Sequence, residues 1–315
     1  MQTMSRGSLE AAPHIRRRRS TRSIMLEVSG ALLPAGLAGV YRFGLRAALV
    51  ILISVFSAVA AEFCYARWAK RPQSVGDMSA VVTGLLLAYN LPVSVPLWMP
   101  AVGAVLAIVL VKMLFGGIGC NFVNPALTAR AILMTSWPDH MSAAAFGVPL
   151  RGVEAVTAAT PLTAVYSFGD LLLGRAPGCI GETARLLLLL GGIYLLIRRV
   201  ITWQIPVTML FGVFCLNLLF PAEQAAFSAA AREVLSVGLM LGAWFMATDY
   251  TTSPRTGLGK CLFGLGCAVM TFVLRRFAAM PGGVSYAILF MNLFTPMIDR
   301  FLRPGGRSGK PWRKK

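Results

Sequence analysis

The chain contains two stretches that align with each other without a gap: Gly84-Leu-Leu-Leu-Ala-Tyr-Asn-Leu-Pro-Val-Ser-Val-Pro96 and Gly242-Ala-Trp-Phe-Met-Ala-Thr-Asp-Tyr-Thr-Thr-Ser-Pro254. Each begins with glycine, continues with apolar residues, becomes polar and reaches proline at the same offset. Proline ends a helix because it lacks a backbone donor and clashes with the preceding turn. The pattern therefore indicates two related, interrupted helices, unless two unrelated helix ends share it by chance.

The composition around these stretches is typical of a membrane protein. Of 315 residues, 57% are hydrophobic and only 13% are charged, whereas about a quarter of the residues in a soluble domain are charged. Apolar segments such as 101–111 and 186–197 are continuous rather than alternating, which favours helices over a barrel. We expect ten spans, at about 24–41, 44–66, 78–92, 96–114, 122–137, 184–197, 203–220, 233–248, 257–274 and 283–302.

Several of these spans are shorter than the roughly 20 residues that a straight crossing needs. The third, fifth and eighth are also interrupted by Asn, Pro, Thr or Asp. Such segments are typical of half-helices that meet near mid-membrane, where irregular backbone lines a cavity or is buried in protein. The aligned stretches end the third and eighth spans, an odd number apart, so the two copies face opposite ways. We predict an all-α polytopic membrane protein with about ten transmembrane helices, in two inverted five-helix repeats with broken helices.

This interpretation divides the chain into a basic N-terminal segment, repeat one, a polar interval, repeat two and a basic tail, at about 1–23, 24–137, 138–183, 184–302 and 303–315. The repeats and the interval form the membrane domain, 24–302. An even number of spans places both basic ends in the cytoplasm, as the positive-inside rule requires, and the interval on the extracytoplasmic side.

The net charge of +18 does not indicate nucleic-acid binding, because much of it lies in 16–22 and 300–315, beside apolar spans. The tail could contact a partner or anionic lipid, or act only as a topology signal. No convincing small-residue cleavage site follows Arg16–Arg19, so we expect the first span to be retained. The six cysteines form no Cys-x-x-Cys pair and His14 and His140 are far apart, so we predict no metal site.

The stretch Gly116-Gly-Ile-Gly-Cys-Asn-Phe-Val-Asn-Pro-Ala126 joins the fourth and fifth spans. Its glycines allow tight turns near a ligand, and Pro125 suits the first turn of a helix. Asn121 and Asn124 are three residues apart, so both amides could face one ligand. The alternative is a capped turn that satisfies its own backbone. The spacing is not that of a dinucleotide fingerprint.

A carboxylate and a pair of hydroxyls complete the candidate residues. Asp249 ends an apolar span, where a carboxylate is costly without a partner. It could help to bind a cation, cap the next helix or pair with Arg255. In the polar interval, Thr157-Ala-Ala-Thr160 precedes Pro161, which favours an extended backbone at Thr160. That hydroxyl could be a helix cap, a hydrogen-bonding group or a site of covalent modification.

Four groups of residues form a recognisable set: Pro13-His-Ile-Arg16 with Ser20-Thr-Arg-Ser-Ile-Met25, Gly116 to Ala126, Phe245-Met-Ala-Thr-Asp-Tyr-Thr-Thr-Ser-Pro254, and Ser285-Tyr-Ala-Ile-Leu-Phe-Met-Asn292. Together they resemble the D-type subunit of the Rnf electron-transport complex, which is related to the B-type subunit of the sodium-translocating NADH:quinone reductase. The similarity covers nearly the whole chain, in order.

The resemblance implies covalent FMN. The family joins the flavin phosphate to a threonine as a phosphoester, within a Ser-Gly-Ala-Thr pattern. The matching residues are Thr157-Ala158-Ala159-Thr160, which places the acceptor at Thr160. Thr157 keeps the hydroxyl of the serine that it replaces, whereas Ala158 removes the backbone freedom of glycine. A tethered flavin cannot diffuse away from an extracytoplasmic site.

The resemblance also implies a second, non-covalent flavin, riboflavin, for which Asn121, Asn124 and Pro125 are the candidates. It implies a complex in the bacterial cytoplasmic (inner) membrane that transfers electrons from ferredoxin to NAD⁺ and translocates Na⁺ or H⁺. Asp249 is the candidate for ion coupling. The implied partners are the other Rnf subunits, which would bind NAD and iron–sulfur clusters, and a flavin transferase.

Two other functions fit the residues alone. An inverted repeat with broken helices could form a channel or secondary transporter for a small solute. The altered Ser-Gly-Ala-Thr pattern is also compatible with a flavin-free membrane scaffold.

Overall fold

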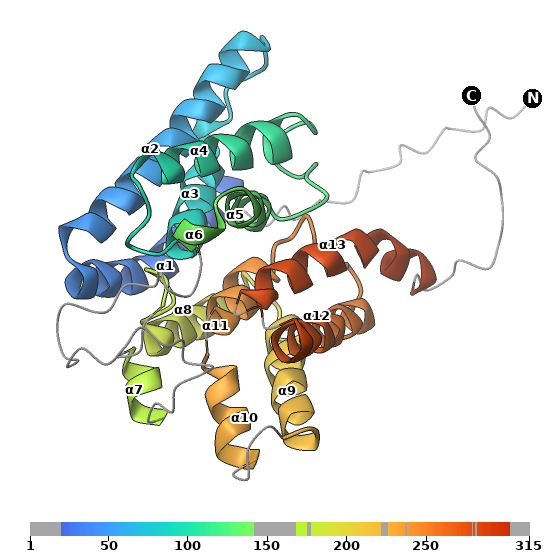
Figure 1. The fold of residues 1–315 in the computed structure, drawn as a ribbon. Coiled ribbons are helices and arrows are strands. Elements are labelled where there is room, and N and C mark those ends of the chain that lie inside the picture. The colour runs from blue at the N-terminus through green and yellow to red at the C-terminus, as the bar shows by residue number, and fades with distance from the viewer. Residues whose placement is uncertain are drawn as a thin grey trace, which may run out of the picture.

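The structure is a computed structural model that describes residues 20–141, 168–174, 178–221, 226–236, 238–278, 280 and 282–302. All regular elements in this part of the chain are helical (Figure 1). In chain order they are α1 (Thr21–Phe43), α2 (Leu45–Trp68), η1 (Val75–Asp77), α3 (Ser79–Tyr89), α4 (Trp98–Leu106), η2 (Ala107–Met113), α5 (Pro125–Ser136), α6 (Pro138–Met141), α7 (Phe168–Leu173), α8 (Arg185–Ile197), α9 (Gln204–Leu219), α10 (Ala226–Val234), α11 (Leu239–Leu241), η4 (Gly242–Met246), α12 (Gly257–Phe277) and α13 (Gly283–Phe301).

The helices account for the apolar segments of the sequence. Within the described residues, α1, α2 and α12 are long and apolar enough to cross a membrane on their own. The segments Phe227–Val234 and Leu239–Met246 form a broken pair bent by 62°, at the place of the eighth predicted span. An all-helical bundle with several apolar helices is consistent with a polytopic membrane protein. The number of ten crossings stays a prediction.

The outer face of α2 illustrates the membrane character of the bundle. Leu52, Phe56 and Trp68 are 64%, 76% and 81% exposed. A large apolar surface of this kind is costly in water but is expected where a helix faces lipid or another protein chain.

Local sequence signals explain where the helices begin and end. The Ser20 hydroxyl accepts a hydrogen bond from the Ser23 amide at 3.2 Å and so caps α1. Gly44, with φ of +75°, ends that helix and donates its N–H to the Val40 carbonyl. Left-handed residues also precede α3 and α11, namely Met78 (φ +65°) and Gly238 (φ +74°).

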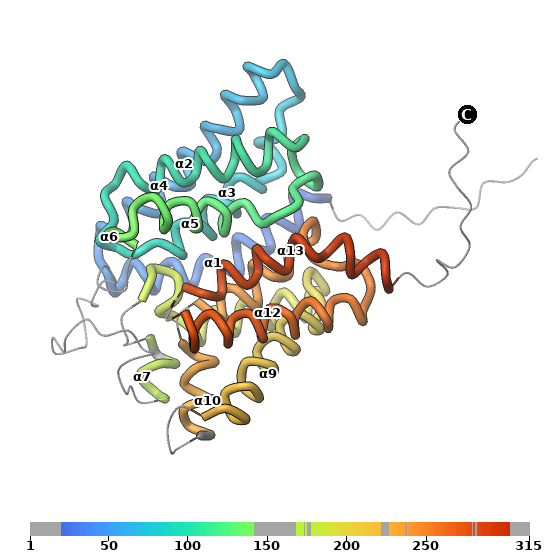
Figure 2. Tube along the Cα trace, turned by 45° about the vertical axis from the view of Figure 1, so that its right-hand side comes forward, coloured from blue at the N-terminus to red at the C-terminus, as the bar shows by residue number. Residues whose placement is uncertain are grey.

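The helices fall into two groups along the chain. Those from α1 to α5, blue to green, lie mainly on one side, and those from α8 to α13, yellow to red, on the other (Figures 1 and 2). Four helices in each group follow the same spacing. Those that start at residues 45, 79, 98 and 125 match those that start at 204, 239, 257 and 283, 158 to 160 residues later.

One of these matched pairs meets where the two groups join, because α5 packs on α13, as Figure 2 shows. Helix α1 packs on α8 at the same junction. The end of α3 contacts η4: Asn90 Nδ2 donates a hydrogen bond to Met246 Sδ at 3.4 Å.

Tyr89 illustrates how closely the centre is packed. Its ring is 1% exposed and its hydroxyl donates to the Leu32 carbonyl at 2.9 Å. A Cβ atom at Gly36 would lie 2.1 Å from the Tyr89 hydroxyl, and one at Gly181 would lie 2.2 Å from Tyr89 Cβ. Glycine is therefore required at both positions because only a bare backbone fits beside the ring.

Candidate functional site

A cavity of about 410 Å³ lies between the two groups of helices. Its wall combines apolar side chains of α1, α3 and α8 with the glycine-rich turn before α5 and the segment around η4. The polar and aromatic residues that line it are Thr21, Ser79, Thr83, Lys112, Asn121, Asn124, Trp244, Phe245, Thr248, Asp249, Tyr250 and Thr251. Largely apolar cavities of 300–1,000 Å³ with a few convergent polar groups are typical of small-molecule sites.

Asn124 is fixed at the wall of this cavity by its role as a helix cap. Its Oδ1 accepts hydrogen bonds from the Ala126 and Leu127 amides at 3.1 and 3.2 Å, and Pro125 occupies the first helical position of α5. Its Nδ2 donates to the Met246 carbonyl at 3.2 Å. This bond joins the start of α5 to the end of η4 and uses one of the two amide hydrogens.

Asn121 and Asp249 lie together in the same cavity. Asn121 is 8% exposed and donates to the Val123 carbonyl at 3.3 Å, and both Asn121 and Asp249 line the cavity. Both asparagines line this cavity, and the binding of one ligand by their two amides stays a prediction. The sequence alone did not place Asp249 beside them.

The Asp249 carboxylate organises the turn that follows η4. It accepts hydrogen bonds from the Thr251 amide at 3.4 Å, the Thr251 hydroxyl at 3.0 Å and the Thr252 hydroxyl at 3.4 Å. The suggestion that Asp249 caps the next helix is wrong. Helix α12 is capped by Thr256, whose hydroxyl accepts from the Gly259 amide at 3.1 Å.

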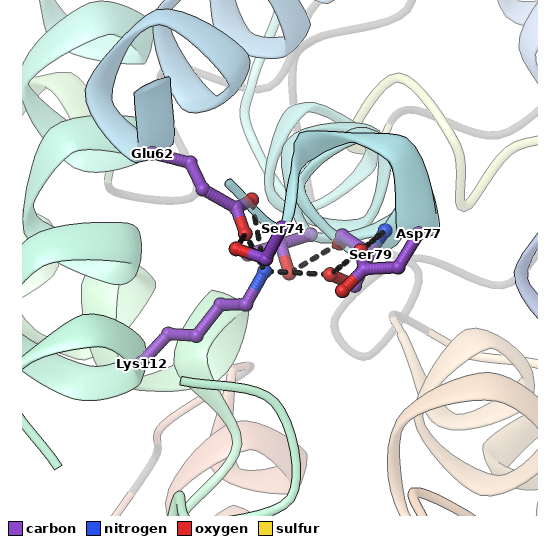
Figure 3. A network of polar contacts seen from close by, with 6 residues as sticks. Glu62, Ser74, Asp77, Ser79 and Lys112 are labelled. Atoms are coloured by element: carbon purple, nitrogen blue, oxygen red, sulfur yellow. Dashed lines mark hydrogen bonds and ion pairs between the residues drawn. The ribbon is translucent and has the colours of Figure 1, made fainter. Parts of the chain in front are cut away.

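A buried ion pair adjoins the cavity, and sequence reasoning missed it (Figure 3). Lys112 Nζ donates to both Glu62 carboxylate oxygens at 2.9 Å and to Ser79 Oγ at 2.6 Å. Glu62 is 0% exposed and Lys112 is 3% exposed. Glu62 also accepts from the Ser74 hydroxyl, and Asp77 accepts from Ser79.

The local structure explains how Lys112 reaches this position. It lies in η2, a π-helical segment that continues α4. Such segments widen the helix by a residue and are frequent at functional sites. In the predicted topology the fourth span, 96–114, ends in the cytoplasm, so the sequence alone predicts Lys112 as a charge at that end. The sequence signal that could have revealed the buried ion pair was Glu62, a carboxylate inside an otherwise apolar span.

A second buried polar cluster lies at the junction of the helix groups. Arg130 of α5 donates to Asn90 Oδ1 and Ser285 Oγ, both at 2.8 Å, and lies 3.7 Å from Glu182 Oε1. Arg130 and Glu182 are 4% and 2% exposed. Glu182 also interacts electrostatically with Arg185. Arg130 therefore connects the end of α3, the start of α13 and the turn before α8.

Thr157 and Thr160, the predicted sites of flavin attachment, lie outside the described residues. Along the chain, the nearest described helices before and after these threonines are α6, which follows α5, and α7, which packs on α8 and α10. Of the predicted site residues, Asn121, Asn124, Pro125 and Asp249 are thus placed together.

Comparison with known proteins gives a consistent result over the whole chain. The model of the NQR2, RnfD, RnfE family matches residues 8–306. The D-type subunit of the Na⁺-translocating ferredoxin:NAD⁺ oxidoreductase complex of Acetobacterium woodii is 44% identical, with 94% of this chain and 93% of the relative covered. The corresponding subunit of the proton-translocating ferredoxin:NAD⁺ oxidoreductase complex of Clostridium ljungdahlii is 40% identical over 94% and 95%. That of the ion-translocating oxidoreductase complex of Halorhodospira halophila is 38% identical over 94% of each. The chain belongs to the NQR2, RnfD, RnfE family.

Proposed function

We propose that this chain is the D-type membrane flavoprotein subunit of an Rnf-type complex, which couples electron transfer from ferredoxin to NAD⁺ to the translocation of Na⁺ or H⁺. The observation that carries the proposal is the full-length similarity to relatives that bear this name, together with a cavity lined by the matching Asn-x-x-Asn-Pro motif. The chain is one subunit of the enzyme, and its partners are the other Rnf subunits.

We propose that FMN is attached to Thr160 as a phosphoester by a flavin transferase. The support is the match of Thr157-Ala-Ala-Thr160 to the family pattern and its place in the polar interval between the helix groups. Threonine serves here as a tether and not as a nucleophile in turnover. The flavin supplies the redox chemistry, and the protein sets its position.

We propose that the cavity holds the second, non-covalent flavin, riboflavin. Its volume of about 410 Å³ falls within the range for small-molecule sites. Trp244, Phe245 and Tyr250 offer surfaces on which a flat aromatic ring can pack. Asn121 and Asn124 offer amide groups to the ring's carbonyls and nitrogens. When bound, the flavin would supply one- or two-electron transfer, and these residues would orient its ring and exclude water.

Asp249 is the proposed ion-coupling residue of this chain. Its carboxylate is the anionic group among the described cavity residues, and three hydrogen bonds orient it. The relatives named above differ in the ion given in their names, Na⁺ for one and protons for another. The choice between the two ions is therefore left open for this chain.

The proposed topology has about ten spans in two inverted repeats, with both termini cytoplasmic and the flavin-bearing interval extracytoplasmic, in the bacterial inner membrane. The equal spacing of four helix starts supports the repeat. So does the contact between matching helices. The short helices around the cavity fit the broken spans of this architecture.

In-gel flavin fluorescence of the denatured protein tests the covalent site. Wild type and Thr160→Ala are each co-expressed with a flavin transferase, and Thr157→Ala serves as the matched control. We expect a fluorescent band in wild type that disappears only in Thr160→Ala. A band in all three would move the attachment elsewhere. No band in any, with the transferase active on another substrate, would favour the flavin-free scaffold or transporter.

A further inference from the structure

Lys112 is a basic residue in the wall of the cavity. Among the described residues that line it, Lys112 carries the positive side chain and Asp249 the negative one. The other lining side chains are apolar, aromatic, hydroxyl or amide groups. A charge in such a low-dielectric wall acts on a bound molecule more strongly than it would in water.

One member of the ion pair lines this space. Lys112 contributes to the cavity wall, whereas Glu62, its 2.9 Å partner, does not. Glu62 is 0% exposed and belongs to α2. Lys112, and not Glu62, is therefore the member of the pair that a molecule in the cavity would contact.

The position of the ammonium group is fixed before any molecule binds. It has three acceptors, the two Glu62 oxygens and Ser79 Oγ, at 2.9, 2.9 and 2.6 Å. Ser79 is held in turn by Asp77, whose Oδ1 accepts from the Ser79 amide at 2.8 Å. Figure 3 shows these side chains converging from α2, the η1–α3 turn and η2. A preorganised charge requires little reorganisation when the charge of its neighbour changes.

We propose that Lys112, positioned by Glu62 and Ser79, sets the redox potential of the cavity flavin by stabilising its reduced form. This inference rests on the proposed function, in which the cavity holds a non-covalent flavin. Reduction adds negative charge to the ring, and a charge near the ring nitrogens is a recognised means by which a protein adjusts a flavin. In this role Lys112 takes no part in a chemical step; its charge changes the stability of the reduced flavin relative to the oxidised flavin.

The test uses the full chain in lipid nanodiscs, produced without a flavin transferase so that Thr160 stays unmodified. Acid extraction and chromatography identify the non-covalent flavin, and spectroelectrochemical titration gives its midpoint potential. The variants are Lys112→Met, Lys112→Arg, Glu62→Gln and the control Lys260→Met. Lys260 donates to Thr202 at 3.1 Å and does not line the cavity.

The two halves of the ion pair are expected to act in opposite directions. In Lys112→Met, the equilibrium constant for reduction of the flavin should fall on the order of tenfold. For a two-electron couple this makes the midpoint potential about 30 mV more negative. In Glu62→Gln, the uncompensated ammonium should make the potential more positive. Lys112→Arg, which keeps the charge, should shift it less than Lys112→Met, and Lys260→Met should leave it unchanged.

Shifts in the same direction for Lys112→Met and Glu62→Gln would overturn the inference, because a general disturbance of packing does not reverse sign. The absence of any shift in flavin-loaded protein would also overturn it, and would leave the cavity site itself intact. If Lys112→Met loses the flavin, the sign of the shift in Glu62→Gln decides. A wild-type chain without extractable flavin would refute the proposed cavity site and this inference together.

Discussion

Arg130 is the residue whose replacement we expect to destabilise the bundle most clearly. It lies 4% exposed where the two helix groups meet, with Asn90 and Ser285 as acceptors at 2.8 Å and Glu182 at 3.7 Å. The substitution Arg130→Met keeps a similar length and an apolar stem. It removes the charge and the hydrogen bonds but leaves the other three side chains in place.

The expected loss of unfolding free energy is about 4 kcal/mol. Hydrogen bonds between transmembrane helices contribute only about 0.6 kcal/mol each, so the two bonds to Asn90 and Ser285 account for roughly 1 kcal/mol. Leaving one member of a buried ion pair without its partner costs about 3–5 kcal/mol. Arg185, which also interacts with Glu182, offsets part of this cost and places it near the lower limit. The unpaired Glu182 carboxylate, and not the lost hydrogen bonds, therefore dominates.

Unfolding in mixed micelles, by titration with dodecyl sulfate and detection through the six tryptophans, measures this loss. Arg198→Met is the matched control, because Arg198 forms a 3.0 Å pair with Glu27 and its side chain is 48% exposed, whereas that of Arg130 is buried. Surface pairs of this kind contribute little, so the control should unfold like wild type.

The double variant Arg130→Met/Glu182→Gln separates charge from packing. If the uncompensated carboxylate is the main cost, removing it should recover all but about 1 kcal/mol, since replacing both members of a buried pair is often close to neutral. The reasoning is refuted if the double variant is no more stable than Arg130→Met. It is also refuted if Arg130→Met unfolds together with Arg198→Met.

Three further predictions follow from the packing and from the exposure of particular side chains. Gly181→Ala should cost about 1–3 kcal/mol in the same unfolding assay, because its Cβ would lie 2.2 Å from Tyr89 Cβ; an unchanged stability would contradict the packing. Asn124→Ala should cost about 1 kcal/mol through the lost cap and reduce the extractable flavin, measured by acid extraction, whereas full flavin content would argue against the proposed cavity site. Cys64 and Cys120, both exposed, should react with an impermeant maleimide in inverted vesicles and not in intact cells; labelling in intact cells would contradict the proposed orientation.

The sequence by itself determined the features that depend on neighbouring residues. Long apolar runs predict helices, since a span must satisfy its own backbone, and the helices lie where the runs do. The Asn124-Pro125 pair predicts a helix start, and Asn124 is the cap of α5. The pairing of Gly84–Pro96 with Gly242–Pro254 predicts a repeat. The equal spacing of the helix starts is compatible with it.

The tertiary structure decided which distant charges meet. Glu62 and Lys112 are fifty residues apart, and Arg130 and Glu182 slightly more, so no local pattern links them. The sequence identified Lys112 as a cytoplasmic charge, but packing of α2 against η2 buries it beside a carboxylate. Likewise, Asp249 joins Asn121 in one cavity only because η4 packs between α8, α9 and α13. A buried charge is tolerated where a partner lies within a few ångströms, and that distance is set by how helices pack and not by their order in the chain.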